Sequence, residues 1–276
     1  MKLRLFGLEL EVYNRPNIAL ITLPIILCIL LYIAPIPDKT QLQFTFENPN
    51  PLHIYTPSLI HVNQTHLIGN MVSYLLLVHA NIILFALTKE NRLLIRYSAA
   101  TFAALPVAHA LLWNTLTYAL YRTYIGSVGF SVMVAAFAGI QISYSTLAYR
   151  KATPIEYDQL NLFLAALTLV AGIILGAYYK PEPLYLVSGV CMTLLFIYYS
   201  RGPLTSIYRY HTGIRSPEVT LVTEVLLVGF LFVGLGFPRI FVSGGRVINI
   251  LSHGVGLLWG LLLPQIDHRL MDRNLV

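Results

Sequence analysis

Charged residues and cysteines are both scarce in this sequence of 276 residues. Asp, Glu, Lys and Arg together make up 11% of the chain, whereas a soluble domain usually contains about 25%. The shortage extends from end to end, which excludes a large soluble domain. The two cysteines, Cys28 and Cys191, both lie in apolar runs, which argues against a disulfide framework.

Motifs that hold cofactors are also missing. No glycine-rich loop has the spacing that cradles phosphate groups, and no set of His, Cys, Asp and Glu residues has the spacing of metal ligands. We therefore expect neither a metal ion nor another cofactor. The formal net charge of +6 would suit nucleic acid, but the positions of the charges indicate a membrane-topology signal instead, and we expect no nucleic-acid partner.

Apolar residues dominate the composition. They make up 57% of the chain, and the mean hydropathy is +0.69. A helix that crosses a bilayer needs about 20 mostly apolar residues. About eight such stretches predict an all-α, polytopic helical bundle that forms one domain, residues 1–276. The predicted spans are 17–36, 66–88, 94–116, 128–149, 160–178, 184–200, 219–236 and 247–264.

The distribution of Lys and Arg predicts the orientation. With the N-terminus in the cytoplasm, the inner segments hold 13 of the 18 Lys and Arg residues and the outer segments hold 5. Cytoplasmic loops normally carry this excess. We therefore expect a plasma-membrane protein with both termini cytoplasmic. Residues 1–16 are expected to form a short strand or interfacial segment, and 37–65 a long outer loop that lies partly in the membrane interface.

Four polar residues lie near the outer ends of these predicted helices. His66 and Asn70 belong to H-L-I-G-N, Ser131 belongs to G-F-S, and His253 begins H-G-V-G. In the predicted orientation the three helices all enter from the outside, so each residue lies within about two turns of the outer surface. Polar residues inside a membrane are costly and usually functional. We expect the four side chains to form one site.

The residue types in this site suit peptide hydrolysis by a serine. Ser131 would be the nucleophile and His253 the base that takes its proton. His66 and Asn70 are four residues apart, share one helix face, and would donate hydrogen bonds to the oxyanion. No Asp or Glu lies at the same depth to orient His253, so the sequence predicts a Ser-His dyad and not a triad.

Small residues predict that the two helices carrying the dyad pack closely. Their faces consist of Ser131, Ala135 and Gly139 on one helix and of His253, Gly256 and Gly260 on the other. Such faces let helix backbones approach each other in a bilayer. Gly129 is expected to let the backbone of a substrate approach the Ser131 hydroxyl.

Three segments carry a resemblance to a known family. They are P-S-L-I-H-V-N-Q-T-H-L-I-G-N-M, G-F-S-V-M-V-A-A-F-A-G and S-H-G-V-G-L-L-W-G. They resemble the H-x-x-x-N, G-x-S-G and H-x-x-G-x-x-x-G signatures of rhomboid intramembrane serine proteases. The resemblance implies the roles given above for Ser131, His253, His66 and Asn70, and His61 matches another histidine common upstream in the family. It also implies a six-helix core with about two extra helices, and a membrane-protein substrate.

The sequence departs from the family pattern in several places. Val132 replaces the second glycine of G-x-S-G, and Ala135 stands where many bacterial members carry an aromatic residue. The Trp-Arg pair often found in the first loop is missing. Three predicted helices, and not one, separate Ser131 from His253, and the sequence leaves open which of them completes the core. Substrate preference, oligomeric state and the effect of Val132 and Ala135 on activity are also left open.

Two other functions remain open. A non-catalytic rhomboid-like protein would keep the fold and bind membrane clients without cleaving them. A proton-coupled transporter would use His79, His109 and Glu224, although the sequence contains no internal repeat of the kind many transporters have. Outside that role, His79 and His109 are predicted to form hydrogen bonds between helices.

Overall fold

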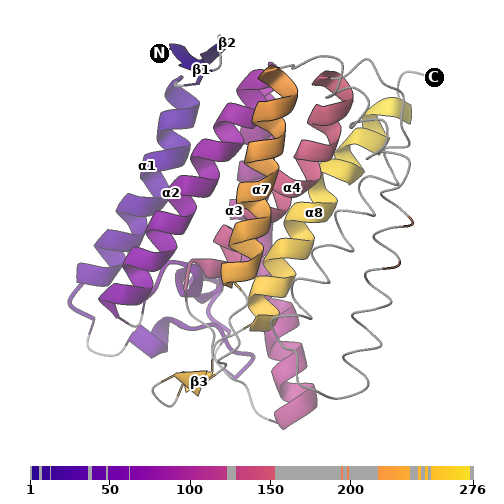
Figure 1. The fold of residues 1–276 in the computed structure, drawn as a ribbon. Helices are drawn as coiled ribbons and strands as arrows, with labels where there is room; N and C mark the ends of the chain where they lie inside the picture. Colours follow the sequence, from indigo (N-terminus) through magenta and orange to yellow (C-terminus); the bar gives the residue numbers. More distant parts are fainter. Residues whose placement is uncertain are drawn as a thin grey trace.

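The computed structural model shows a bundle of long helices (Figure 1). The helices of the described part are α1 (Arg15–Ile33), α2 (Gln64–Leu87), α3 (Asn91–Tyr121), α4 (Ser131–Ala152), α7 (Pro217–Gly236) and α8 (Ile250–Arg273). The residues that the structure describes are 2–5, 8–12, 14–36, 39–47, 49–61, 63–122, 129–152, 194, 198, 217–236, 242–243, 246–247 and 250–273.

Several of these helices are long and apolar enough to cross a membrane. Four qualify in the described part of the chain: α1, α2, residues Asn91–Thr115 of α3 and residues Ser131–Tyr149 of α4. Within α7, Thr220–Val233 is a shorter apolar helix. The prediction of a mainly α-helical, membrane-spanning protein is confirmed. The count of eight spans stays a prediction, because 160–178 and 184–200 lie outside the described residues apart from two isolated positions.

The ends of the helices follow from local side-chain bonds. Asn14 caps α1 by accepting from the backbone N–H of Asn17, and Asn63 caps α2 by accepting from the N–H of His66 at 2.8 Å. α3 runs past the predicted end at residue 116. Asn114 is tolerated inside it because its buried amide donates to the carbonyls of Ala110 and Phe44, at 2.8 and 3.2 Å.

The N-terminal segment forms two paired strands and not the single short strand that was one of the two predictions; its place at the membrane interface stays a prediction. β1 (Lys2–Leu5) pairs antiparallel with β2 (Leu8–Glu11), and the register sets Lys2 opposite Glu11 and Arg4 opposite Glu9. Opposite charges across a strand pair are favourable. A second hairpin, β3 (Val242–Ser243) with β4 (Arg246–Val247), lies at the other end of the bundle (Figure 1). The all-α prediction did not include these two short pairs of strands.

The outer loop is structured and packs under the helix bundle. It contains three short 3-10 helices, Lys39–Leu42, Pro51–Ile54 and Thr56–Ser58. Tyr55 donates from its hydroxyl to the carbonyl of Ala103 in α3 at 3.0 Å. The end of the loop, from Pro57 through His61, is mostly buried, so it is positioned to contribute to a site between the helices.

α4 is the central helix of the bundle. It packs against α2, α7 and α8, and most of its length is buried. Aromatic rings fill the space between it and α2, where Tyr74 meets Phe130 and Phe137 edge-on, with ring centroids 5.1 and 5.4 Å apart. The Tyr74 hydroxyl donates to the Leu20 carbonyl at 2.5 Å and so links this cluster to α1. The core therefore extends along α4, from Phe130 just before its N-terminus to Tyr149 near its end.

The predicted close packing of α4 and α8 is confirmed. A methyl group on Gly256 would overlap the carbonyl oxygen of Val132, and one on Gly260 would overlap that of Ala136. On the opposite side of the contact, a methyl group on Gly139 would overlap the carbonyl of Leu257. The two backbones are thus in direct contact, which only residues without a side chain allow.

We expect Gly256→Ala to lower the free energy of unfolding by about 1–3 kcal/mol, because the added methyl group forces α4 and α8 apart. Gly254→Ala is the matched control: a methyl group there would have no atom within 4 Å, and alanine is the better helix former. Thermal unfolding in detergent micelles measures both. Equal losses in the two variants would contradict direct contact at Gly256.

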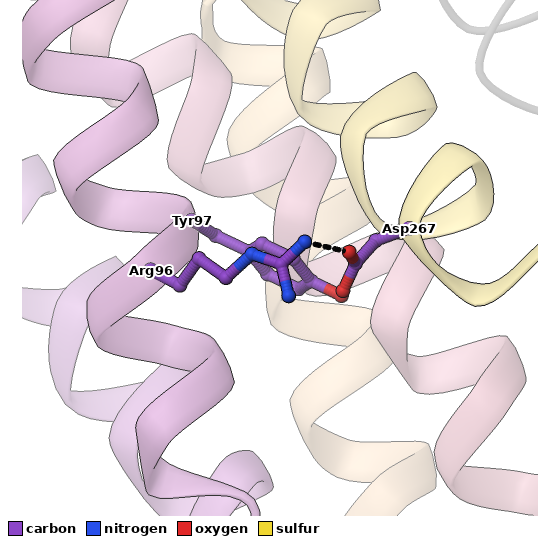
Figure 2. A network of polar contacts seen from close by, with 3 residues as sticks. All are labelled: Arg96, Tyr97 and Asp267. Atoms are coloured by element: carbon purple, nitrogen blue, oxygen red, sulfur yellow. Dashed lines mark hydrogen bonds and ion pairs between the residues drawn. The ribbon is translucent and has the colours of Figure 1, made fainter. Parts of the chain in front are cut away.

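A polar network joins α3 to α8 at the opposite end of the bundle from Ser131. Asp267 of α8 accepts hydrogen bonds from the guanidinium of Arg96 and, at 3.0 Å, from the hydroxyl of Tyr97 (Figure 2). Tyr97 and Asp267 are buried, whereas the side chain of Arg96 is largely exposed. A buried carboxylate needs such partners, so this network fixes the side of α8 that faces α3.

Asp267→Ala should reduce the free energy of unfolding by about 1–3 kcal/mol, because it leaves the buried Tyr97 hydroxyl without its acceptor. Arg92→Ala removes an exposed cation one turn earlier on α3 and should change stability by less than about 1 kcal/mol. Chemical denaturation followed by tryptophan fluorescence compares the two. The network has no structural importance if both variants unfold like the wild type.

Candidate functional site

His66 and Asn70 face the backbone that leads into α4. A Cβ atom placed on Gly129 would lie 2.6 Å from Cε1 and 3.0 Å from Nε2 of His66, and 3.7 Å from Nδ2 of Asn70. The edge of the imidazole ring and the amide therefore contact Gly129 directly, two residues before Ser131. The fold brings together three residues that the sequence analysis had assigned to one site.

The conformation of Gly129 explains why glycine is required there. Its φ is +122°, which side-chain-bearing residues rarely adopt. Its N–H donates to the carbonyl of Pro57 at 2.8 Å, so the outer loop holds this turn in place. Sequence reasoning did not identify Pro57, because a backbone carbonyl leaves no signal in residue type.

A hydrogen-bond chain orients the side chain of Asn70. Nδ1 of His61 lies 3.1 Å from the carbonyl of Leu59, and Nε2 of His61 lies 3.0 Å from Nδ2 of Asn70. A carbonyl can only accept, so His61 carries its proton on Nδ1, and its Nε2 accepts from Asn70. The Asn70 side-chain amide has a second N–H. The hydrogen bonds from Leu59 through His61 hold the amide group so that it faces Gly129.

His66 is held at the start of α2, and one nitrogen of its ring has no hydrogen-bond partner in the part of the chain that the structure describes. Its backbone N–H is capped by Asn63, and its ring packs edge-on against the ring of His61, with centroids 5.2 Å apart. Nδ1 is buried and has no hydrogen-bond partner among the described residues. An imidazole fixed in this way can present its ring edge to a group bound beside Gly129.

Ser131 is the first residue of α4 and is half-buried. The first N–H groups of a helix have no partner within the helix, and they favour negative charge nearby. Ser131 thus begins its helix two residues after Gly129, the residue that His66 and Asn70 contact. This combination suits stabilisation of an oxyanion.

His253 lies in the first turn of α8 and is half-buried. The α4–α8 contacts set its level, because Gly256 meets Val132 and Gly260 meets Ala136. Counting back three residues from the pair Gly256 and Val132 puts His253 of α8 at the same height along the bundle as Gly129. Within the described part of the chain no hydrogen bond joins Ser131 to His253. In enzymes without substrate such catalytic bonds are often long and tighten only in the complex.

Val132 and Ala135, the two departures from the motif pattern, both lie at the contact with α8. Val132 is buried, and its carbonyl faces Gly256. Ala135 lies beside Gly256 as well, 3.2 Å from the position that a Cβ on that glycine would take. The small side chain of Ala135 is therefore part of what lets α8 approach α4.

His109 forms the interhelical hydrogen bond that the sequence predicted, and its partner is Ser252. Nε2 of His109 lies 2.6 Å from Oγ of Ser252, and both side chains are buried. Nδ1 of His79 instead lies 2.7 Å from the carbonyl of Leu75 in its own helix, and Glu224 is exposed on α7. Sequence reasoning missed Ser252. Its place next to His253 in the sequence does not indicate which neighbouring helix the serine side chain contacts.

No protein-family model, curated protein or solved structure matches this chain. The functional interpretation therefore depends on the three motif segments and on the contacts among His66, Asn70, Gly129 and the N-termini of α4 and α8. These contacts join segments that are far apart in the sequence.

Gly129→Ala is expected to destabilise the protein by about 1–3 kcal/mol or more, because it combines a strained φ with overlap on the His66 ring. Gly69→Ala, on α2 between His66 and Asn70, meets no atom within 4 Å and should be neutral or slightly stabilising. Melting temperatures of the two variants in the same detergent make the comparison. A Gly129 variant as stable as the Gly69 variant would contradict the contact with His66.

Proposed function

We propose that the protein is a rhomboid-like serine protease that cleaves membrane proteins within or beside a transmembrane segment. The observation that carries the proposal is the contact of His66 and Asn70 with Gly129, next to the N-terminus of the helix that begins with Ser131. The direct contact between α4 and α8 supports it, because it holds His253 at the same level.

The proposed reaction uses only side chains and backbone of this chain. The Oγ of Ser131 attacks the carbonyl carbon of the substrate while His253 takes its proton. The negative charge that forms on the carbonyl oxygen receives hydrogen bonds from His66 and from the Asn70 N–H that His61 does not use. The C–N bond then breaks as His253 protonates the leaving amine. Water attacks the resulting ester by the same route and regenerates Ser131.

The proposed topology has eight spans in the plasma membrane, both termini in the cytoplasm, and the site near the outer surface. The hairpin β1–β2 and the C-terminal end of α8 lie at the same end of the bundle (Figure 1), which supports an even number of crossings. The proposed six-helix core consists of α1 to α4, α7 and α8. α7 is chosen because it packs against both α2 and α4.

The decisive experiment compares cleavage of a transmembrane test substrate in liposomes by the wild type and by Ser131→Ala. We expect the loss of Ser131 to reduce turnover at least about 10³-fold, because the nucleophile is removed. Ser145→Ala is the control on the same helix: Ser145 is buried deeper, and its hydroxyl has no partner among the described residues. It should cleave like the wild type, and equal cleavage by Ser131→Ala would refute the proposal.

One rival is favoured by a specific observation. Val132 replaces a glycine of the motif and is fully packed, and Ser131 is not hydrogen-bonded to His253 within the described residues. Both features fit a rhomboid-like protein that binds membrane clients without cleaving them. Labelling with a fluorophosphonate separates the two: a protease labels at Ser131 and loses the label in His253→Ala, whereas a client-binding protein does not label.

A further inference from the structure

Side-chain hydrogen bonds join α3 and α8 at three levels. His109 bonds to Ser252 at 2.6 Å, Trp259 donates from Nε1 to Oγ1 of Thr101 at 3.2 Å, and Asp267 accepts from Arg96 and Tyr97. The levels are spaced by about 10–12 Å along α8, given the rise of about 1.5 Å per residue. The two helices are antiparallel, so this ladder extends over most of their contact.

α8 therefore has two contact faces with different chemistry. Ser252 and Trp259 are seven residues apart and share the face that meets α3. His253, Gly256 and Gly260 share the face that meets α4. Neighbouring residues are separated by about 100° around a helix. With Ser252 bonded to α3, this spacing puts the next residue, His253, on the face of α8 that carries Gly256 and Gly260.

We propose that His109 is a positioning residue for His253, acting through Ser252. This inference rests on the proposed protease function. His109 does not contact the reacting atoms in this role; it holds the first turn of α8 at the rotation in which the His253 ring reaches Ser131.

The first turn of α8 has particular need of such a partner. Helix ends have fewer backbone hydrogen bonds than helix interiors, and here the turn carries the proposed base. The sequence predicts no acidic residue at this depth that would orient His253 as in a triad. Gly256, the nearest glycine in contact with α4, lies three residues farther along α8. The buried bond between His109 and Ser252 lies in this first turn, at the residue next to His253.

The test measures kcat and KM for the same transmembrane substrate in four variants. His109→Ala and Ser252→Ala should each lower kcat by about 10- to 100-fold, the size expected when a catalytic group is misplaced by about 1 Å. KM should stay within about twofold. The double variant should be no slower than His109→Ala, because both changes remove the same bond. His109→Gln keeps a long polar side chain and should restore most of the rate.

The control is Thr101→Val, which breaks the next bond of the same ladder, about two turns from His253. It removes the hydroxyl without changing the shape of the side chain, and we expect wild-type kcat. If Thr101→Val lowers kcat as much as His109→Ala, the ladder serves general stability and the positioning role is overturned. Wild-type kcat in His109→Ala, or effects of the two single changes that multiply in the double variant, would overturn it as well.

Fluorophosphonate labelling distinguishes failure of this inference from failure of the proposed function. If Ser131 of the wild type is labelled and His109→Ala labels about 10- to 100-fold more slowly, both stand. If the wild type is labelled and His109→Ala labels at the same rate, the positioning role alone fails. If the wild type is not labelled and does not cleave, the protease function fails and the inference falls with it.

Discussion

The direct backbone contact between α4 and α8 is the constraint on which the rest of the structure depends. It exists because Gly139, Gly256 and Gly260 have no side chains at the crossing. In a bilayer lipid is as apolar as the helices, so close packing, and not the hydrophobic effect, drives association. The same contact sets the register that brings the first turns of both helices to one level, and the candidate site consists largely of those turns.

The end of the bundle that holds Gly129 is organised by backbone and loop contacts around this residue. The carbonyl of Pro57 holds the turn, His61 orients Asn70, and Asn63 caps the helix that carries His66. Each polar group placed near hydrocarbon would be costly without such partners. The arrangement therefore fixes the side chains beforehand, as electrostatic stabilisation of a reaction requires.

The opposite end of the bundle is held together in a different way. Asp267 with Arg96 and Tyr97, and Tyr144 with Glu90 and Thr88, tie the helices together through side chains that bond one another. At the end that holds Gly129, by contrast, a ring nitrogen of His66 is buried and has no hydrogen-bond partner among the described residues. The networks around Asp267 and Tyr144 lie far from this group, so they hold the helices together independently of the candidate site.

The sequence by itself determined the membrane class and the approximate positions of the described helices, because apolar length is a local signal. It also placed His66, Asn70 and Gly129 in one site, and these residues do meet in the fold, whereas the grouping of Ser131 and His253 with them stays a prediction. It also predicted the small-residue contact of α4 and α8. It could not determine the N-terminal hairpin, the Pro57 carbonyl at Gly129 or the bond between His109 and Ser252. Those depend on which segments meet in space, and only the packing of helices distant in the chain decides that.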